Sequence, residues 1–581
     1  MTAEPVRDIG FARWEDPDAW MESMKGARWE RLIKDENERV DDFVKENNVT
    51  SLLKDFEKDI KKAQILNGIP YAFKSGPISI SMRSTMFMSW KWGNEKVTES
   101  RDVFADDRGV WHIKEVGNGA EVFELEFLDS NKKSKWSIKP VGPQIAISGS
   151  RCFYLGVENR LWFNELWSCD ALTGKNKKML YKEIDPRNIL SIERADSKIY
   201  VIRENAQDKI YYRIDPDESI IHIPNPLSLS PRLENTYGLD MIWHSKKLSI
   251  LRQNGKSQLW HDGNKVLEIP AGKITVDPWA VHEDRKSAVI MVTQPHIPVI
   301  LYEWSNGKLE KVTQDSKTDL QFVQGSINGI HYDITFKSNI SSPKHVIVIG
   351  YGAYGFPTTA QYVRTRWNPL IESDWGIAYT YLPGGGDHTT AFAKSARIAG
   401  RHKTIEAFVA CIKDIKNRYK LSPKDIVIYG RSAGGLLMGG SLGLHPNGDL
   451  FGGIFTEVPY VDELRTTTNP QLPLTRLEYN EFGNPKRSVL DFLSVGLLSP
   501  ADEAMTLKTP NVFVYAKTAV NDSQVYAYEP MKWIRRLRAN APDSPKLLKI
   551  ELNFGHFTPP DLTVKNYAFD CAVIQTLVMS K

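Results

Sequence analysis

The sequence DIVIYGRSAGGLLMG, residues 425–439, decides how the C-terminal part of this chain folds. Residues 425–429 are mostly apolar and predict a buried strand, and the small residues from Gly434 onward predict a helix packed closely on a sheet. Between them lies the pattern G-x-S-x-G, which in the order strand, turn and helix is typical of a nucleophile elbow. We therefore expect Ser432 to be a catalytic nucleophile. The helix N-terminus behind it favours the negative charge that develops during acyl transfer.

The region around this motif alternates strands with helices. Apolar runs predict strands at 345–349, 511–515 and 546–552, and helical spacing predicts helices at 404–419, 528–537 and 566–579. Such alternation is typical of a mostly parallel, doubly wound sheet covered on both faces. Together with the elbow, it predicts an α/β-hydrolase fold.

The order of elements then selects the partners of the serine. Hydrolases of this fold carry an acid and a histidine on loops after later strands, in the order Ser, Asp or Glu, His. Asp522 follows one predicted strand, and His556 follows the last one and is the only histidine after His445. We expect His556 to act as general base and Asp522 to orient its imidazole. Two rival acids, Asp502 and Asp543, precede their strands.

A second glycine motif competes for a different interpretation. Residues 350–355, GYGAYG, match the dinucleotide fingerprint G-x-G-x-x-G. That fingerprint needs a helix to open within it, and the proline at position 357 opposes one. We instead assign this loop to the oxyanion side of the pocket, where the Tyr351 hydroxyl would donate beside the backbone N–H of Ala433. A purely structural glycine turn is the alternative.

The pattern of predicted secondary structure changes twice before this region. Residues 1–68 are expected to be helical and to join the hydrolase domain, with an apolar face of Trp29, Leu32, Ile33, Val40, Phe43 and Val44. Residues 69–335 contain short strands such as 198–202, 209–213, 247–251 and 287–291, at a loose period typical of propeller blades. Six or seven blades fit, and a β-sandwich is the competing fold. Residues 336–581 form the expected catalytic domain.

Composition bounds the class of protein. A chain of 581 residues should form more than one domain, and its net charge of +4 argues against a nucleic-acid partner. The sequence has no apolar run near the roughly 20 residues that span a bilayer, and residues 1–5 do not resemble a signal peptide. Four scattered cysteines suit neither a disulfide framework nor a metal site. We expect a cytoplasmic protein with no metal, cofactor or membrane partner.

Several motifs together resemble the prolyl oligopeptidase family of serine peptidases, and within it the oligopeptidase B branch. The motifs are DPDAWME at 16–22, ENE at 36–38, GYGAYG at 350–355, GGGD at 384–387, VPYVD at 458–462, PLT at 473–475, EYNEFGNP at 478–485, ND at 521–522 and EPMKW at 529–533. They lie toward both ends of the chain. The middle carries the resemblance only through its propeller-like texture.

The resemblance implies a hydrolase domain built from both chain ends, with an inserted propeller that restricts substrates to short peptides. It implies that Glu478 binds the basic side chain before the scissile bond. Glu481, Gln524 and Phe557 complete the expected substrate-binding residues. The expected function is a serine peptidase cutting after Arg or Lys through an acyl-enzyme, acting as a monomer or small homo-oligomer.

Three departures leave other functions open. The resemblance implies an arginine where this chain has Gln524, another where it has Pro383, and small residues where it has residues 557–560, FTPP. These changes keep the triad but favour an atypical acyl acceptor or substrate, such as peptide cyclisation, ester hydrolysis or cleavage of a specialised peptide. A catalytically silent protein that binds partners through its propeller is the other alternative.

Overall fold

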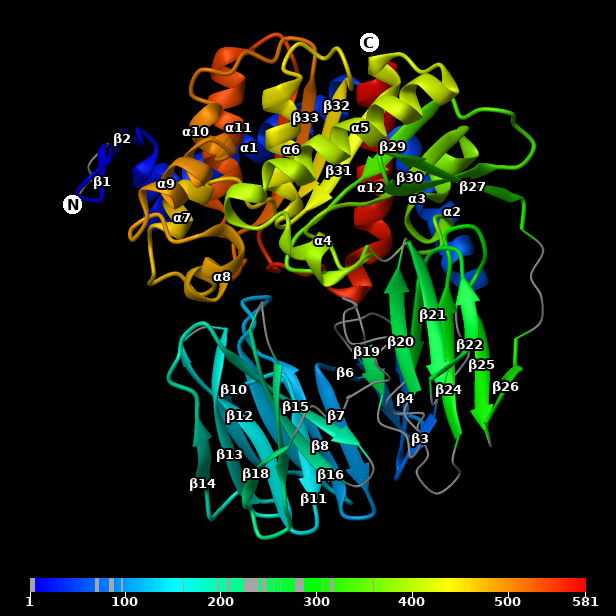
Figure 1. Cartoon of the computed structure of the whole chain (residues 1–581), viewed down its shortest axis with the longest axis vertical. Coiled ribbons are helices and arrows are strands. Elements are labelled where there is room, and N and C mark those ends of the chain that lie inside the picture. The colour runs from blue at the N-terminus through cyan, green and yellow to red at the C-terminus, as the bar shows by residue number, and fades with distance from the viewer. Residues whose placement is uncertain are drawn as a thin grey trace.

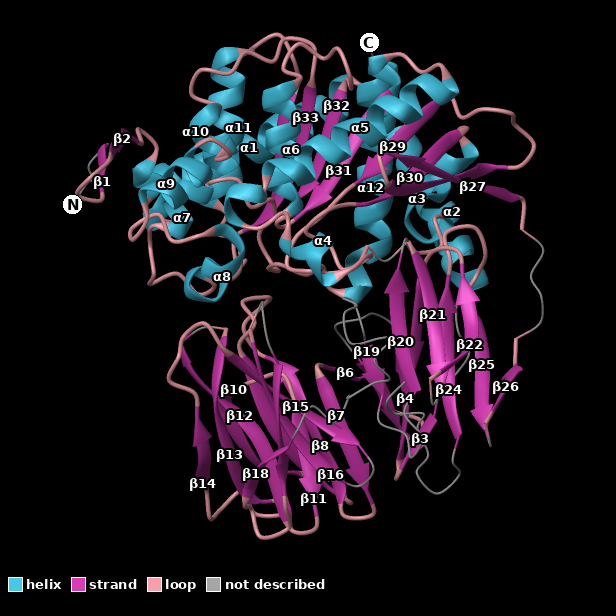
Figure 2. Ribbon diagram, viewed as in Figure 1, coloured by secondary structure: helices cyan, strands magenta, loops and turns pink. Residues whose placement is uncertain are grey.

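The structure, a computed structural model, has an α/β part and a β part made of separate sheets (Figures 1 and 2). It describes residues 6–67, 73–82, 88–95, 98–159, 161–195, 198–205, 209–223, 240–242, 248–253, 255–261, 263–276, 287–305, 307–313, 318–358 and 360–580. The first and last described elements, β1 (Val6–Asp8) and α12 (Thr563–Met579), both belong to the α/β part (Figure 1). None of the helices in these ranges has the length and apolar character needed to cross a membrane.

One eight-stranded sheet forms the centre of the α/β part. Its strands, in spatial order, are β27 (Leu320–Ile327), β28 (Ile330–Lys337), β30 (Trp375–Tyr381), β29 (His345–Ile349), β31 (Ile426–Arg431), β32 (Gly453–Glu457), β33 (Phe513–Ala519) and β34 (Lys546–Glu551). The pairs β27–β28 and β28–β30 are antiparallel, and all the other neighbours are parallel. The predicted α/β-hydrolase fold with a mostly parallel sheet is confirmed.

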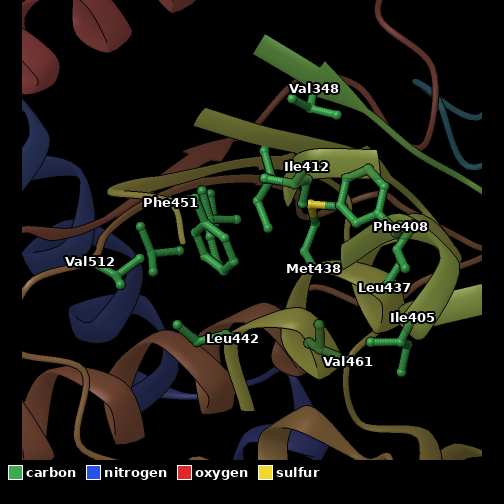
Figure 3. Close-up of a cluster of buried hydrophobic side chains, with 14 of the residues drawn as sticks. Val348, Ile405, Phe408, Ile412, Leu437, Met438, Leu442, Phe451, Val461 and Val512 are labelled. Carbon is green, nitrogen blue, oxygen red and sulfur yellow. The ribbon is translucent and has the colours of Figure 1, made fainter. Parts of the chain in front are cut away.

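Helices cover both faces of this sheet, as continuously apolar strands require. The first hydrophobic core unites α5 (His402–Tyr419), α6 (Gly434–Leu444) and α11 (Tyr528–Asn540), and the second unites α2 (Thr50–Asn67), α3 (Arg364–Glu372) and α12 (Thr563–Met579). In the first core, Phe408 of α5 and Met438 of α6 belong to one cluster with Val348 of β29 (Figure 3). Each such buried side chain contributes roughly 1.5–3 kcal/mol of transfer free energy.

The N-terminal segment packs on the α/β part but is not helical throughout. The predicted helices form as α1 (Ala27–Glu46) and α2, whereas β1 (Val6–Asp8) and β2 (Arg13–Glu15) make an antiparallel hairpin. The expectation of helix from residue 1 is therefore wrong for the hairpin, whose three-residue strands are too short for a sequence period. In α1, the Asn37 side chain accepts from Ile550 N (2.9 Å) and donates to Ile550 O (3.0 Å) on edge strand β34.

A buried charge cluster also ties this segment to the α/β part. The Lys532 ammonium on α11 is fully buried and lies 2.8 Å from Asp16, 2.9 Å from Glu22 and 2.8 Å from Asp462. Asp16 and Glu22 belong to the segment before α1, and Asp462 to the loop after β32. Three carboxylates around one ammonium give these distant segments a single fixed arrangement.

Within the described residues, the β part contains six four-stranded antiparallel sheets, the blades of a propeller. They are β3–β6 (Phe73–Ser75, Ile78–Met82, Met88–Trp92, Thr98–Ser100), β7–β10 (Asp102–Asp106, Gly109–Glu115, Phe123–Asp129, Ser134–Val141), β11–β14 (Ile145–Ser148, Arg151–Asn159, Trp162–Asp170, Lys178–Lys182), β15–β18 (Ile189–Ala195, Lys198–Glu204, Lys209–Ile214, Ile220–Ile223), β19–β22 (Asp240–Ile242, Leu248–Gln253, Lys256–His261, Asn264–Ile269) and β23–β26 (Lys273–Val276, Ser287–Thr293, Ile300–Ser305, Lys308–Lys311). Residue 247 of one predicted strand lies outside the described residues. The propeller is confirmed, with six blades.

The expected domain boundary at 335/336 falls inside β28. Because β27 and β28 pair into the eight-stranded sheet, that sheet begins at Leu320 and the last blade ends with β26. The hairpin β27–β28 turns at Asn328 (φ 52°) and Gly329 (φ 77°), the same local signal that a blade hairpin gives. Only the pairing of β28 with β30 assigns it to the sheet. The other expected boundary, 68/69, lies outside the described residues.

Candidate active site

Ser432 sits in a sharp turn between β31 and α6. Its backbone is left-handed (φ 54°), a conformation that costs a non-glycine residue roughly 1–2 kcal/mol. The turn is held because Ser432 N donates to Glu457 O (3.0 Å) and Ser432 O accepts from Tyr460 N (2.9 Å). A Cβ at Gly430 would lie 2.6 Å from the carbonyl oxygen of Gly434, so glycine is required there. The sequence thus folds locally into the elbow that its motif predicts.

Asp522 and His556 lie on the loops after β33 and β34 and are bonded to each other. His556 Nδ1 is 2.8 Å from Asp522 Oδ2, and both residues are almost fully buried. Asp522 Oδ1 also accepts the backbone N–H groups of Gln524 and Val525, each at 2.9 Å. A carboxylate held in this way fixes the imidazole tautomer and leaves Nε2 for another partner.

All three residues follow parallel strands of one sheet, so they meet at the same edge. Among the described residues, the Ser432 hydroxyl has no hydrogen-bond partner. Such hydrogen bonds often close only when a substrate binds. Of the rival acids, Asp502 accepts from the Ser499 hydroxyl (2.7 Å), away from the histidine, and Asp543 is exposed.

Arg431, a residue of the elbow motif, contacts the backbone of the histidine loop. Arg431 donates to the backbone oxygen of His556, and its guanidinium lies 5.1 Å from the ring centroid of Phe557. Arg431 and His556 share a small cavity of about 20 Å³ with Glu457, Lys517 and neighbouring residues. That volume holds about one water. Sequence reasoning missed Arg431, although the motif contains it, and the structure places Phe557 against Arg431 and His556 rather than alone on a loop.

The loop at 350–355 follows β29 and packs near the turn that carries Ser432. Positions 350–358 contain no helix, as the proline predicted. A Cβ at Gly434 would lie 3.7 Å from Tyr351 Cδ2, which puts that ring against the turn that carries Ala433. Burial raises the pKa of the Tyr351 phenol, so the hydroxyl keeps its proton and can donate a hydrogen bond.

A hydrophobic cluster extends from the elbow to α8 (Thr475–Phe482). It consists of Ala353, Ala433, Leu436, Tyr460, Phe482 and Val525, with Tyr351 and Tyr354 packed against it. Glu478 adjoins this cluster and accepts a 2.6 Å hydrogen bond from the Tyr354 hydroxyl. Burial raises the pKa of Glu478 to about 7. Within the described part of the chain this carboxylate has no ion pair, so it is suited to a cationic guest.

The neighbouring acid, Glu481, is already neutralised. Its carboxylate is buried, lies 2.5 Å from Arg401 and 3.1 Å from Arg397, and accepts the backbone N–H of Tyr354 (2.9 Å). The structure therefore brings Glu478 and Glu481 together but gives them different surroundings. The arginine partners were missed because they lie 80 or more positions earlier in the sequence.

Gln524 faces the propeller. Its side-chain amide donates to Glu121 Oε2 at 2.8 Å, and Glu121 belongs to the turn between β8 and β9. Nothing in the sequence near position 121 signals this contact. Among the described residues no cluster of three or more His, Cys, Asp and Glu side chains is arranged to hold a metal ion.

Comparison with known proteins gives a family match within the α/β part. Residues 362–574 match the model of the prolyl oligopeptidase family. Protease 2 from Moraxella lacunata is 31% identical over 218 residues, 37% of this chain and 31% of the relative. Dipeptidyl aminopeptidase BI from Pseudoxanthomonas mexicana is 31% identical over 211 residues, 36% and 28%. Human prolyl endopeptidase-like is 23% identical over 357 residues, 58% and 48%. The chain thus spans at most about half the length of these relatives.

Solved structures match the chain along nearly its whole length. Oligopeptidase B from Leishmania major has a TM-score of 0.80 at 17% identity, covering 98% of this chain and 95% of that one. Prolyl oligopeptidase B from Galerina marginata, bound to a hydrolysis and macrocyclization substrate, has a TM-score of 0.76 at 14% identity, covering 98% and 96%. At these identities the likeness is one of fold.

Proposed function

We propose that this chain, whose residues 362–574 match the model of the prolyl oligopeptidase family, is a member of that family, a serine peptidase that cuts short peptides after arginine or lysine. The observation that carries the proposal is the 2.8 Å hydrogen bond between His556 and Asp522, at the same sheet edge as the left-handed Ser432. A nucleophile elbow and an oriented histidine together are the machinery of acyl transfer.

The reaction follows from these positions. His556 takes the proton of the Ser432 hydroxyl as its oxygen attacks the peptide carbonyl, while Asp522 stabilises the imidazolium. The Ala433 N–H and the Tyr351 hydroxyl donate to the developing oxyanion, and one such donor is worth roughly 3–4 kcal/mol. His556 then protonates the leaving amine, and water hydrolyses the acyl-enzyme by the reverse sequence.

Specificity for a basic side chain rests on Glu478. An arginine or lysine would place its stem among the rings of Tyr351, Tyr354 and Tyr460 and its cation at the carboxylate. Because Glu478 lacks an ion pair among the described residues, a cation there would not compete with another protein charge. Glu481 supports the pocket indirectly, because its two arginines fix the loop that carries Tyr354.

The restriction to short peptides rests on the propeller, which lies beside the α/β part (Figure 1). A turn of the β7–β10 blade contacts the loop of Asp522 through Glu121 and Gln524, so a bulky folded substrate must displace the propeller to enter. The four cysteines are free and buried, which supports residence in the cytoplasm. One chain supplies every proposed catalytic residue, so a monomer suffices.

Acyl transfer to an amine is the second candidate. It uses the same acyl-enzyme, and one observation favours it. Gln524 occupies the position where the resemblance implies a substrate-binding arginine, but its side-chain amide donates a hydrogen bond to Glu121 instead. The substrate's backbone would then be held differently in the pocket. The two outcomes differ only in what attacks the acyl-enzyme.

A peptide-library digest read by mass spectrometry tests the proposal. We expect cleavage after Arg and Lys, a length limit, and no cleavage of a folded protein that carries an exposed basic loop. Cyclised products would favour the second candidate. Absence of any product, with no labelling of the purified protein by a fluorophosphonate probe, would show that the chain is not a serine hydrolase.

A further inference from the structure

One turn of the propeller contacts both loops that carry the proposed acid and base. The turn, residues 116–122, joins β8 and β9. The Asn521 side chain donates to Asn118 O (3.0 Å), and the Ser523 hydroxyl and Gln524 amide both donate to Glu121 Oε2 (3.1 and 2.8 Å). The three donors lie within two positions of Asp522, so the propeller contacts the acid loop on both sides of the acid.

The backbone of the same turn lies against the backbone of the histidine loop. A Cβ placed on Gly119 would lie 2.1 Å from Gly555 N, and a Cβ on Gly555 would lie 1.9 Å from Gly119 O. No side chain fits at either position without a shift of the backbone. Gly555 immediately precedes His556, so the turn limits how far the histidine can move toward the propeller.

Turn 116–122 has a defined conformation within its blade. Asn118 (φ 51°), Gly119 (φ 91°) and Glu121 (φ 55°) are all left-handed, which is costly for the two non-glycine residues. Internal hydrogen bonds hold it: Glu121 N donates to the Glu115 side chain (3.1 Å), and Val116 N donates to Val122 O (2.8 Å). The blade therefore presents a fixed surface to the catalytic loops.

We propose that turn 116–122 is a positioning element of the catalytic triad, acting through the loops of Asp522 and His556. The inference rests on the proposed function and extends it, because it gives the propeller a part in the chemistry as well as in size selection. A displacement of about 1 Å between reacting groups can cost about a hundredfold in rate, so losing this support should slow even a substrate too small to need filtering.

Small acyl substrates separate the two roles. If the propeller only filters, loosening its contact with the catalytic loops leaves hydrolysis of p-nitrophenyl acetate unchanged or faster. If turn 116–122 positions the triad, the same change lowers kcat for this ester while KM changes little. The rate of labelling by a small fluorophosphonate measures the reactivity of Ser432 directly, without turnover.

The first variant pair is Gly119→Ala with Gly149→Ala as its control. Both glycines are left-handed turn residues of the propeller, but a Cβ on Gly149 (φ 54°) would meet nothing within 4 Å. The strain of alanine at positive φ should lower thermal stability in both variants. We expect Gly119→Ala to reduce kcat and labelling rate by about tenfold or more, and Gly149→Ala to stay near the parent.

A second set avoids dependence on one glycine. Glu121→Ala should reduce kcat on the ester by roughly fivefold, since it removes two hydrogen bonds from the acid loop. Gln524→Ala should have a smaller effect of the same kind. The double exchange Glu121→Gln with Gln524→Glu restores a donor–acceptor pair between the two positions, so we expect it to recover much of the lost rate, which a general loss of stability would not.

The outcomes distinguish this inference from the proposed function. If the parent is neither labelled nor active, both fail. If the parent is active and Gly119→Ala matches Gly149→Ala on the ester, the positioning role is wrong while the peptidase proposal stands. If Gly119→Ala does not fold, the Glu121 and Gln524 set decides, and equal ester rates throughout that set would overturn the inference.

Discussion

The α/β part and the propeller resemble known proteins in different ways. The family model matches residues 362–574, all within the α/β part, whereas solved structures match 97–100% of the chain at 14–17% identity. The family model thus matches only the α/β part, whereas the comparison of folds also covers the propeller. A triad needs particular side chains at particular positions, but a blade needs only alternating buried and exposed residues and turns of suitable length.

The two parts also differ in how their hydrophobic side chains pack. Two large cores, one on each face of the eight-stranded sheet, unite most of the α/β part. The propeller is held by smaller clusters between neighbouring blades. A change in the α/β part should therefore affect the whole of it, while a change in one blade should remain local. Five predictions, from the largest expected effect to the smallest, test the site and this contrast.

The largest effect should come from the nucleophile. Ser432→Ala should lower hydrolysis of p-nitrophenyl acetate by about ten-thousandfold or more, and His556→Ala should be similarly inactive because members of a triad act as a unit. Ester kinetics and circular dichroism measure activity and fold. Ser494→Ala, at a partly exposed position of α9 (Val489–Gly496), is the control and should be fully active. Turnover of Ser432→Ala within a few-fold of the parent would exclude the mechanism.

The second effect should be structural and confined to the α/β part. Lys532→Met leaves Asp16, Glu22 and Asp462 around a missing ammonium, and removing one partner of a buried ion pair typically costs about 3–5 kcal/mol. Chemical denaturation measures the loss. The control is Arg535→Met on the same helix, whose side chain is half exposed and pairs with Asp18 at 3.2 Å. Its cost should stay below about 1 kcal/mol. Equal costs would contradict the buried cluster.

The third effect should be selective for substrate. Glu478→Gln keeps the shape of the pocket but removes the charge, so activity on Arg and Lys amides should fall by about thirtyfold or more, while a Leu amide is unaffected. A parent that prefers Pro or Leu, or a variant that keeps its Arg preference, would refute the role of Glu478.

The same pocket predicts a pH dependence. Because burial raises the pKa of Glu478 to about 7, its carboxyl is mostly neutral below about pH 6 and mostly ionised above about pH 8. A cationic side chain needs the ionised form, so KM for an Arg amide should fall as pH rises through this range. KM for the Leu amide, the internal control, should not follow it.

The smallest effect should come from the propeller. Asp102 accepts the backbone N–H groups of Ile145 (2.8 Å) and Val103 (2.9 Å) and lies 3.2 Å from Arg194, and so joins three blades. Asp102→Asn should cost about 1 kcal/mol of stability and leave ester hydrolysis unchanged below the unfolding temperature. Thermal unfolding measures the first and ester kinetics the second. A loss as large as that of Lys532→Met would show that the blades are as cooperative as the α/β part.

Much of the candidate site could be predicted because its signals are local. The elbow around Ser432 lies in one short stretch, and Asp522 and His556 each follow a strand that can be recognised from its apolar run. Parallel strands then bring the three positions to one edge without any knowledge of packing. The blade hairpins were equally local, which is why the propeller was expected and β27–β28 was wrongly included in it.

The rest depends on partners far apart in the sequence. Glu121 and Gln524 are 403 positions apart, and Gly119 meets Gly555 with no side chain to signal it. The distinct surroundings of Glu478 and Glu481 come from Tyr354 and Arg401, which belong to other segments. No period or motif encodes which loop of a blade will face which loop of a hydrolase, because that choice is made by tertiary packing.

The paired hydrogen bonds between Asn37 and Ile550 have a consequence for biosynthesis. The two residues are 513 positions apart, and at about 5–20 residues per second the ribosome needs roughly half a minute to two minutes to make the second after the first. Each blade can form from its own contiguous segment as it emerges. Until β34 has been made, the apolar face of helix α1, which includes Trp29, stays uncovered. The nascent chain should therefore carry a folded propeller beside an uncovered helix, a state that suits chaperone capture until β34 has been made.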